Sequence, residues 1–432
     1  MPVADAAVAA TLADRTLASR LPQFPWDRLA PAKVRAAAHP DGIADLSIGT
    51  PVDPVPGVVK DALTAAADSP GYPLTKGTTA LRAAAADWLA RRHGVTVDPD
   101  DVLPLIGTKE LIAWLPTLLG CQAGDRVSFP ELAYPTYDIG ARLAGAEAVA
   151  TDYPDHAGAD PGRSGPDRGG PGQFGPLQSG PVQSGPVQSG PVLSGPVQSG
   201  PVQSGPDQSG IGPIRLAWLN SPSNPTGRVL PTARMRELVL WARTAGAVLA
   251  SDECYIDLGF EAAPVSLMHP DVCGGSHQGL LAVYSLSKRS NMAGYRAGLV
   301  CGDPDLIAAL LEIRKHAGMA MPAPIQAAMA AALSDDTHAA EQHARYARRR
   351  EVLRPALEQA GWVVSHSEAG LYLWATHPRY DCWESVGVLS EAGILVSPGE
   401  FYGPAGIRHI RVALTATDER IAAAASRLGG LR

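Results

Sequence analysis

The chain has 432 residues and a formal net charge of −7, from 43 acidic and 36 basic side chains. A negative balance argues against nucleic acid or an anionic membrane as partner, and no apolar run reaches the roughly 20 residues of a membrane helix, so a small-molecule substrate is expected. Five scattered cysteines without a C-x-x-C spacing argue against a disulfide framework and against a zinc site, and they predict a cytoplasmic protein.

Short apolar runs alternate with helical patterns through the middle of the chain. This alternation is typical of a mostly parallel sheet covered by helices, which is an α/β fold. Strands are predicted at residues 101–105, 126–129, 146–152, 214–219, 247–250, 281–285 and 297–301, and helices at residues 109–119, 232–245 and 304–315.

A repetitive segment interrupts this pattern at residues 154–213. Its five-residue unit, Gly-Pro-Val-Gln-Ser with small variations, recurs through residues 175–209. Such a composition has little to bury and cannot offset the entropy of ordering, so a disordered surface loop is predicted. Because strands are predicted on both sides of it, the segment is an insertion within a folded domain, which a loop tip tolerates.

The pattern changes after Pro324, where an alanine- and arginine-rich helical stretch leads to Ala356. A long helix followed by strands indicates a smaller α+β domain at the C-terminus. A second domain also fits the length, because a single core stops growing at roughly 250–300 residues. The strand-like segments after this stretch are at residues 362–365, 370–374, 394–397 and 409–414.

The central chemical signal is Lys288, in Ser285-Leu-Ser-Lys288 directly after an apolar strand, with Arg296 eight residues later. Burying an ammonium group is costly unless the group is paired or made neutral. A Schiff base with a cofactor would make Lys288 neutral. The structural alternative is a solvated lysine at the end of a strand.

Two further motifs follow predicted strands in the same manner. Asn224-Pro-Thr-Gly227 comes after the strand at residues 214–219, and Asp252-Glu-Cys-Tyr255 comes after the strand at residues 247–250. Taken singly, the first could be an ordinary turn and Asp252 a helix N-cap. In this order with Lys288, the motifs resemble the class I and II aminotransferases of fold type I across nearly the whole chain.

The resemblance implies pyridoxal 5'-phosphate bound to Lys288. Asp252 would keep the ring nitrogen of the cofactor protonated, so that the ring works as an electron sink. Asn224 and Tyr255 would hydrogen-bond the phenolic oxygen of the cofactor. The aromatic ring of Tyr134 would stack on the cofactor, although a core tyrosine is the alternative.

The cofactor's phosphate requires backbone N–H groups at a helix start and a few cationic or hydroxyl donors. The resemblance assigns this role to the start of the helix predicted at residues 109–119 and to two residues near Lys288, although the helix start could also be a plain cap. The phosphate-binding set is Gly107, Thr108, Lys109, Ser285 and Arg296.

The substrate side of the site also follows from the resemblance. Arg411 would hold the substrate α-carboxylate with its planar fork, and Asn224 and Gly49 would complete that subsite. Tyr72 would reach the phosphate of a neighbouring subunit, which implies a homodimer with active sites at the interface. Lys288, once free, would move the proton from the substrate Cα, and Lys288, Tyr255 and Asp252 form the expected catalytic set.

The implied domain order has four parts. Residues 1–18 would be a flexible N-terminus, and residues 19–50 would pack with the small domain. The large cofactor-binding domain would span residues 51–310, interrupted by the insertion, and the small C-terminal domain would span residues 311–432.

A finer resemblance is to succinyldiaminopimelate aminotransferases of the actinobacterial type. It rests on residues 21–31, 220–224 and 287–296. It implies amino transfer between glutamate and N-succinyl-2-amino-6-oxopimelate in lysine and diaminopimelate biosynthesis, with Lys76 and Arg289 as candidates for the distal carboxylates.

Three alternatives remain open at this point. The same residues would serve an aminotransferase for another amino acid, such as aspartate, or a cofactor-dependent C–S lyase. The third alternative is a regulator built on this fold, which would carry an additional helix-turn-helix module before the matched region. Only about twenty residues precede that region, which argues against a regulator.

Overall fold

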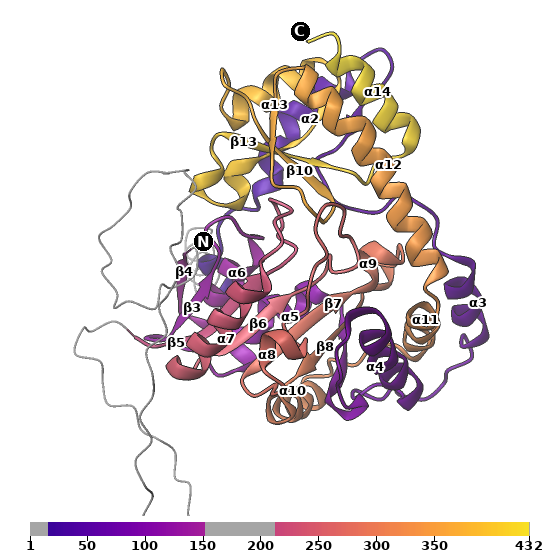
Figure 1. Ribbon diagram of the computed structural model, residues 1–432, viewed down its shortest axis with the longest axis vertical. Coiled ribbons are helices and arrows are strands. Elements are labelled where there is room, and N and C mark those ends of the chain that lie inside the picture. Colours follow the sequence, from indigo (N-terminus) through magenta and orange to yellow (C-terminus); the bar gives the residue numbers. More distant parts are fainter. Residues whose placement is uncertain (1–15, 152–211, 432) are drawn as a thin grey trace, which may run out of the picture. The chain divides into compact units, whose positions relative to one another are not determined.

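The computed structural model describes residues 16–151 and 212–431, which form one compact unit. Most of the predicted flexible N-terminus and most of the predicted disordered insertion therefore lie outside the described residues. Figure 1 shows the arrangement of the described elements along the chain.

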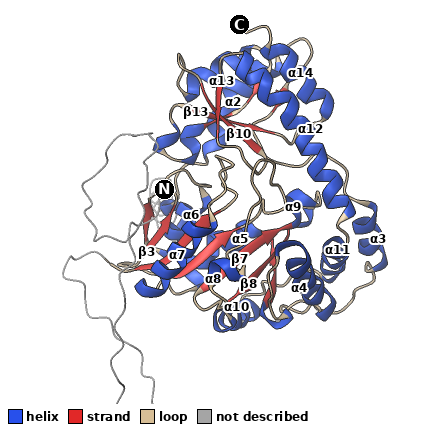
Figure 2. Cartoon of the chain, in the orientation of Figure 1, coloured by secondary structure: helices blue, strands red, loops and turns tan. Residues whose placement is uncertain are grey.

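A seven-stranded sheet forms the centre of the fold, in the order β2-β8-β7-β6-β5-β3-β4 (Figure 2). Neighbouring strands are parallel except for β8, which is antiparallel to β2 and to β7. The mostly parallel sheet predicted from the alternating pattern is confirmed. The strands are β2 Val102–Ile106, β3 Arg126–Phe129, β4 Glu147–Ala150, β5 Ile214–Asn220, β6 Val248–Asp252, β7 Leu280–Ser285 and β8 Ala297–Gly302.

Both faces of this sheet are covered, which explains why its strands are apolar without a break. Along β5, Leu216 and Trp218 point to one hydrophobic cluster, whereas Ala217 and Leu219 point to the other. The first cluster includes residues of α5, α6 and α10, and the second includes residues of α4, α7 and α11. The helices in this part are α3 Gly57–Ala65, α4 Thr79–His93, α5 Thr108–Leu118, α6 Thr136–Ala144, α7 Thr232–Ala245, α8 Pro270–Cys273, α9 Leu286–Arg289, α10 Pro304–His316 and α11 Ala323–Ser334.

A second group of elements surrounds a four-stranded antiparallel sheet in the order β12-β13-β10-β9. The N-terminal helix α2 lies among these C-terminal elements in Figure 1, and β1 pairs in parallel with β11. These elements share a third hydrophobic cluster. They are α2 Ala30–Ala37, β1 Ala44–Asp45, α12 Thr337–Gln359, β9 Val363–Ser365, β10 Tyr372–Thr376, α13 Cys382–Glu391, β11 Ile394–Leu395, β12 Ser397–Pro398, β13 His409–Ala413 and α14 Asp418–Leu428.

Short 3₁₀ helices complete the described elements. They are η1 Leu17–Arg20, η2 Pro25–Leu29, η3 Pro99–Asp101, η4 Ala293–Tyr295, η5 Gly399–Tyr402 and η6 Pro404–Gly406.

Three details differ from the sequence-based expectation. The single helical stretch expected up to Ala356 is two helices, because Asp335 adopts an extended conformation and its side chain accepts a hydrogen bond from the Thr337 N–H at 2.9 Å. The strand expected at residues 394–397 is divided between β11 and β12, which belong to different sheets. Helix α11 packs against α3 and α4 in the cluster of the large sheet, although the expected C-terminal domain included it.

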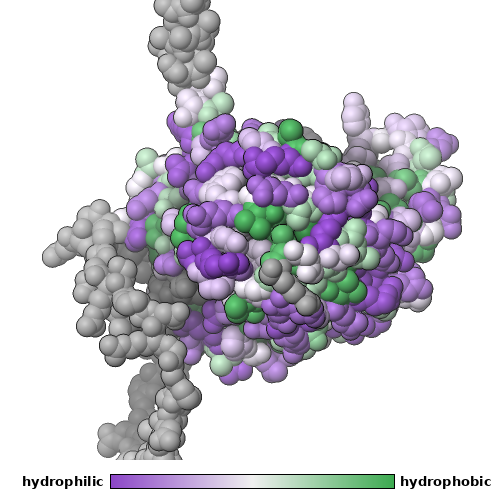
Figure 3. All heavy atoms as spheres, turned by 90° about the horizontal axis from the view of Figure 1, so that it is seen from above, coloured by the Kyte–Doolittle hydropathy of each residue, from purple (hydrophilic) through white to green (hydrophobic). Residues whose placement is uncertain are grey.

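In the face shown in Figure 3, hydrophobic residues occur as separate small areas among hydrophilic ones. Within residues 16–151 and 212–431, no helix has the length and apolar character needed to cross a bilayer.

Candidate active site

A cavity of about 940 Å³ opens at the ends of the central strands. It lies where β6 and β7 end, which is the usual place for a ligand in an open parallel sheet. Residues of the C-terminal sheet and of the N-terminal segment complete its wall. The predicted site residues that line it are Gly49, Thr108, Lys109, Tyr134, Asn224, Asp252, Tyr255, Ser285, Lys288, Arg296 and Arg411.

Lys288 lies in the short helix α9, which begins directly after β7. The Ser285 hydroxyl accepts a hydrogen bond from the Ser287 N–H at 3.1 Å and thereby starts this helix. Lys288 Nζ donates to the Gly49 carbonyl oxygen at 2.5 Å. Burial lowers the pKa of Lys288; Tyr372 and Cys254 oppose this effect, and Arg411 and Arg296 add to it. A lowered pKa increases the fraction of neutral amine, which is the nucleophilic form.

Asp252 ends strand β6 with its carboxylate buried. It accepts hydrogen bonds from Tyr137 Oη at 2.9 Å and from the Cys254 N–H at 3.2 Å. Burial raises the pKa of Asp252, whereas the hydrogen bonds from Cys254 and Tyr137 lower it. A buried carboxylate is costly without a cationic partner, and a protonated ring nitrogen of a cofactor would be such a partner.

An anion-binding corner lies at the start of α5. Gly107 has a φ of +76°, a backbone conformation that favours glycine, and a Cβ at this position would approach Arg296 Nη2 to 2.2 Å. The guanidinium of Arg296 therefore lies directly against the positive end of a helix. Burial lowers the pKa of Lys109, and so does the charge of Arg296. Both features suit a phosphate group.

Arg411 projects from β13 into the cavity and is 3% exposed. Its Nη1 donates to Asn224 Oδ1 at 2.9 Å, and its Nη2 donates to the Ser47 carbonyl oxygen at 2.9 Å. Its guanidinium lies over the rings of Tyr372 and Tyr402, 3.9 and 4.7 Å from their centroids. Since Asn224 Oδ1 is engaged by Arg411, the amide nitrogen of Asn224 is the atom left to meet a cofactor oxygen.

The family model for class I and II aminotransferases matches residues 41–160 and 206–428. The chain belongs to this family. Class I and II aminotransferases use pyridoxal phosphate, and the buried carboxylate, the lysine and the anion-binding corner fit that group.

Two similar proteins and one solved structure place the chain within the family. A 4-dedimethylamino-4-oxo-anhydrotetracycline transaminase of Streptomyces rimosus is 55% identical over 94% of this chain and 99% of its own length. A probable aminotransferase of Mycobacterium tuberculosis is 52% identical over 95% and 86%, respectively. The structure of a probable N-succinyldiaminopimelate aminotransferase from Thermus thermophilus is 26% identical, with a TM-score of 0.74 and coverage of 95% and 100%.

Two residues that contact predicted site residues were not found from the sequence. Tyr137 bonds Asp252 and stacks on Trp218 at 5.2 Å between ring centroids. Tyr137 lies in the first turn of α6, three residues after Tyr134. This spacing from a predicted site residue was the signal available in the sequence. Tyr372 lies on β10, and no motif in the sequence singled it out.

Other predicted residues lie away from the cavity. Tyr72 is fully exposed and does not line it. Lys76 pairs with Asp100 at 3.0 Å. Arg289 is 3% exposed and pairs with Asp257 at 2.9 Å, so the suggestion that Arg289 binds a distal substrate carboxylate is wrong.

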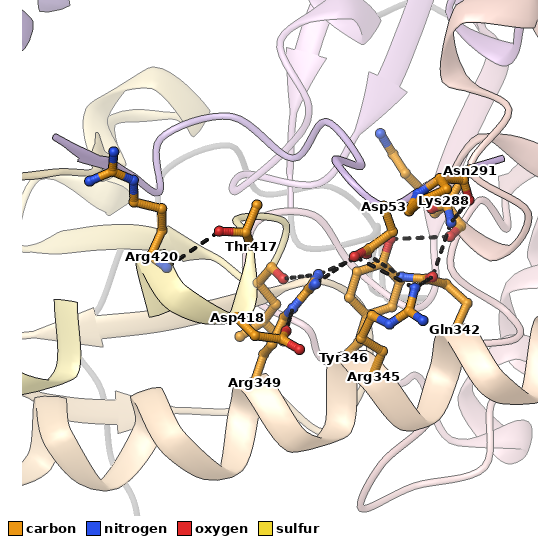
Figure 4. A network of polar contacts seen from close by, with 12 residues as sticks. Asp53, Lys288, Asn291, Gln342, Arg345, Tyr346, Arg349, Thr417, Asp418 and Arg420 are labelled. Carbon is orange, nitrogen blue, oxygen red and sulfur yellow. Dashed lines mark hydrogen bonds and ion pairs between the residues drawn. The ribbon is translucent and has the colours of Figure 1, made fainter. Parts of the chain in front are cut away.

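A network of polar contacts joins α12 to Asp53 and to the segment around Lys288 (Figure 4). The Asp53 carboxylate accepts hydrogen bonds from Arg349 Nη2 at 2.6 Å, from Arg349 Nη1 at 2.8 Å and from Gln342 Nε2 at 2.8 Å. Burial would raise the pKa of Asp53, but the hydrogen bonds from Arg349 and Gln342 hold it below its usual value. Asp53 is therefore held in its charged form, hydrogen-bonded to α12.

The same helix contacts the segment that follows Lys288. Tyr346 Oη donates to the Lys288 carbonyl oxygen at 3.3 Å, and Asn291 Nδ2 donates to Gln342 Oε1 at 3.0 Å. Helix α12 therefore holds both the segment that carries Gly49 and the segment that carries Lys288.

Proposed function

We propose that this aminotransferase exchanges an amino group between glutamate and N-succinyl-2-amino-6-oxopimelate, in lysine and diaminopimelate biosynthesis. The observation that carries the proposal is the cavity of about 940 Å³, which continues past Lys288 and Arg411 to the N-terminal residues Phe24 and Trp26. It lies at the upper end of the usual range for ligand sites and suits an amino acid with a long side chain. The similarity to the Thermus protein, whose name carries this substrate, supports the same assignment.

The site residues divide the work in this proposal. Arg411, fixed by Asn224 and Ser47, orients the substrate α-carboxylate, and the helix start at Gly107 with Arg296 holds the phosphate. Pyridoxal phosphate, when bound, draws electrons away from the substrate Cα and so makes its proton acidic. Lys288 would hold the cofactor, and its side-chain amine, when free and neutral, would accept that proton and become an ammonium group.

We also propose a homodimer that works in the cytoplasm. Tyr72 is exposed and lies outside the cavity of its own chain, which fits a side chain that completes the neighbouring site. The five cysteines are all free thiols, which fits a reducing compartment. Light scattering would give the molecular mass in solution, and a monomer that transfers amino groups at full rate would remove the dimer proposal.

The substrate proposal is tested by mixing the purified protein with N-succinyl-diaminopimelate and 2-oxoglutarate and measuring glutamate. A Lys288→Ala variant is the control, and aspartate is offered as donor in a parallel reaction. We expect glutamate from the succinylated donor only with Lys288 in place. A cofactor-bound protein that used aspartate and ignored the succinylated donor would overturn the substrate, and release of ammonia and pyruvate from cysteine would point to a C–S lyase.

A second candidate is amino transfer to a bulky cyclic ketone. The Streptomyces rimosus relative, at 55% identity, is named for such a compound. The cavity wall also contains a large apolar part, formed by Phe24, Trp26, Ile112, Phe129 and Phe401. Glutamate consumption with a polycyclic aromatic ketone in place of the succinylated substrate distinguishes the two candidates.

A further inference from the structure

Tyr372 connects the two halves of the active site. Its hydroxyl lies 3.1 Å from Tyr255 Oη, and its ring lies under the guanidinium of Arg411 at 3.9 Å from the centroid. The side chain is buried, and it lines the cavity. Tyr255 is proposed to bind the cofactor and Arg411 the substrate, so Tyr372 contacts one residue from each half of the site.

The geometry points to Tyr372 as a positioning residue that acts on the cofactor through Tyr255 and on the substrate through Arg411. The inference rests on the proposed roles of Lys288, Tyr255 and Arg411. It adds to them a residue that no family motif assigned.

The C-terminal sheet holds Tyr372 in this place. On the antiparallel pair of β10 and β13, Trp374 is opposite Arg411 and Tyr372 is opposite Ala413. Tyr372 and Arg411 are therefore diagonal neighbours on one face of the sheet, within reach of long side chains. Loss of the aromatic ring would remove one side of the stack that orients the guanidinium.

The hydroxyl of Tyr372 is also confined. A Cβ on residue 49 would approach Tyr372 Oη to 2.0 Å, so the glycine at this position makes room for the hydroxyl. The carbonyl of the same glycine accepts the hydrogen bond from Lys288 Nζ at 2.5 Å. The hydroxyl thus lies between Tyr255 and the segment that contacts the catalytic lysine.

The direction of the Tyr255–Tyr372 hydrogen bond determines its effect. Either hydroxyl could be the donor at this distance. In the proposed role of Tyr255 its own proton meets the phenolic oxygen of the cofactor, so Tyr372 must be the donor to Tyr255 Oη. A donor that is itself hydrogen-bonded is polarised and donates more strongly.

The test follows the absorbance of the bound cofactor as pH is varied. This absorbance reports the pKa of the nitrogen that joins the cofactor to Lys288. A hydrogen-bond donor at the phenolic oxygen of the cofactor favours the unprotonated form of this nitrogen. Tyr372→Phe weakens the donor Tyr255 and should therefore raise the pKa of the nitrogen by about 0.5 to 1, as expected for one neutral hydrogen bond. Tyr402→Phe is the matched control. Tyr402 also lies over Arg411, but no hydrogen bond joins it to Tyr255 among the described residues, so the pKa should not change.

A double variant separates positioning from a general structural effect. With Tyr255→Phe in place, Tyr372→Phe should add no further change in the cofactor pKa, because its route to the cofactor has been removed. An equal change in both backgrounds, no change at all, or a lowered pKa would overturn the inference.

The substrate half is read from the Michaelis constants. Tyr372→Phe keeps the ring and should leave the KM for glutamate within about twofold, whereas Tyr372→Leu removes the cation–π contact and should raise it roughly fivefold. Equal KM values for the two variants would remove the proposed action through Arg411. If the cofactor absorbance survived Lys288→Ala unchanged, the assignment of Lys288 would fail instead, which keeps the two hypotheses distinguishable.

Discussion

At the scale of single residues, the carboxylate of Asp252 depends on a neighbour outside the family motifs. Tyr137→Phe removes the 2.9 Å hydrogen bond to Asp252 and leaves the hydrogen bonds from Cys254. The pKa of Asp252 should rise further, and the ring nitrogen of the cofactor should lose protonation. Because a hydrogen bond to a charged group is worth roughly 1.5–3 kcal/mol, kcat should fall about tenfold or more.

The comparison for this variant is Asp252→Asn. The double variant Tyr137→Phe, Asp252→Asn should be no slower than Asp252→Asn alone, since Tyr137 acts through the carboxylate. Additive losses would mean that Tyr137 acts by another route.

Glu253 provides a prediction on the pH dependence of stability. Burial raises its pKa from 4.5 to about 7, although hydrogen bonds, including one from the Leu267 N–H, lower it. A raised pKa in the folded state means that the stabilising contribution is present below pH 4.5 and is lost as pH rises through 7. Across this window the free energy of unfolding should fall by about 3 kcal/mol relative to a chain without the group.

Glu253→Gln supplies that reference chain. Urea unfolding between pH 5 and 8 should show a steeper loss of stability for the natural protein than for the variant. Parallel curves would contradict the assigned pKa.

At the scale of elements, a buried ion pair joins the segment that carries Lys288 to the segment that carries Tyr255. Arg289 directly follows Lys288, Asp257 lies two residues after Tyr255, and their side chains meet at 2.9 Å with 3% of Arg289 exposed. The guanidinium also lies over the ring of Trp88 at 5.3 Å. Removing one partner leaves the other charge buried, so Asp257→Leu should lower the free energy of unfolding by roughly 3–5 kcal/mol.

The control replaces both partners. Asp257→Leu with Arg289→Met removes both charges and should recover most of the loss, since apolar side chains of similar volume often replace a buried pair without cost. Failure of the double variant to recover would indicate that the geometry of the pair, and not the burial of an unpaired charge, determines stability.

At the scale of the whole molecule, sheet topology limits how far the insertion can be shortened. Strands β4 and β5 both run parallel to β3 on opposite sides of it. A parallel connection of this kind requires about a dozen residues or more. No candidate site residue lies within residues 154–213.

Replacing residues 154–211 with a Gly/Ser linker of about 15 residues should therefore preserve cofactor binding and amino transfer. A linker of about four residues should prevent folding, because it cannot span the connection. Loss of activity with the longer linker and an intact fold would give the repeats a direct role in the reaction.

Much of the molecule follows from local patterns in the sequence. Apolar runs between helical periods indicated the parallel sheet, because strands buried on both faces have no polar alternation. Lys288 and Asp252 could be proposed because each lies at the end of such a run, and the ends of parallel strands meet at one edge of a sheet, where both residues line the cavity. The interruption of the helical stretch at Asp335 was missed, because an aspartate inside an alanine-rich run does not reveal its conformation.

Only the tertiary structure decided which residues distant in the chain contact one another. Tyr137 meets Asp252 across 115 positions, and Tyr255 meets Tyr372 across 117 positions. The burial of Arg289 against Asp257 likewise depends on β6 and β7 being neighbours. Sequence periodicity specifies which face of an element is apolar, but the order and register of the strands determine which polar side chains share a buried space.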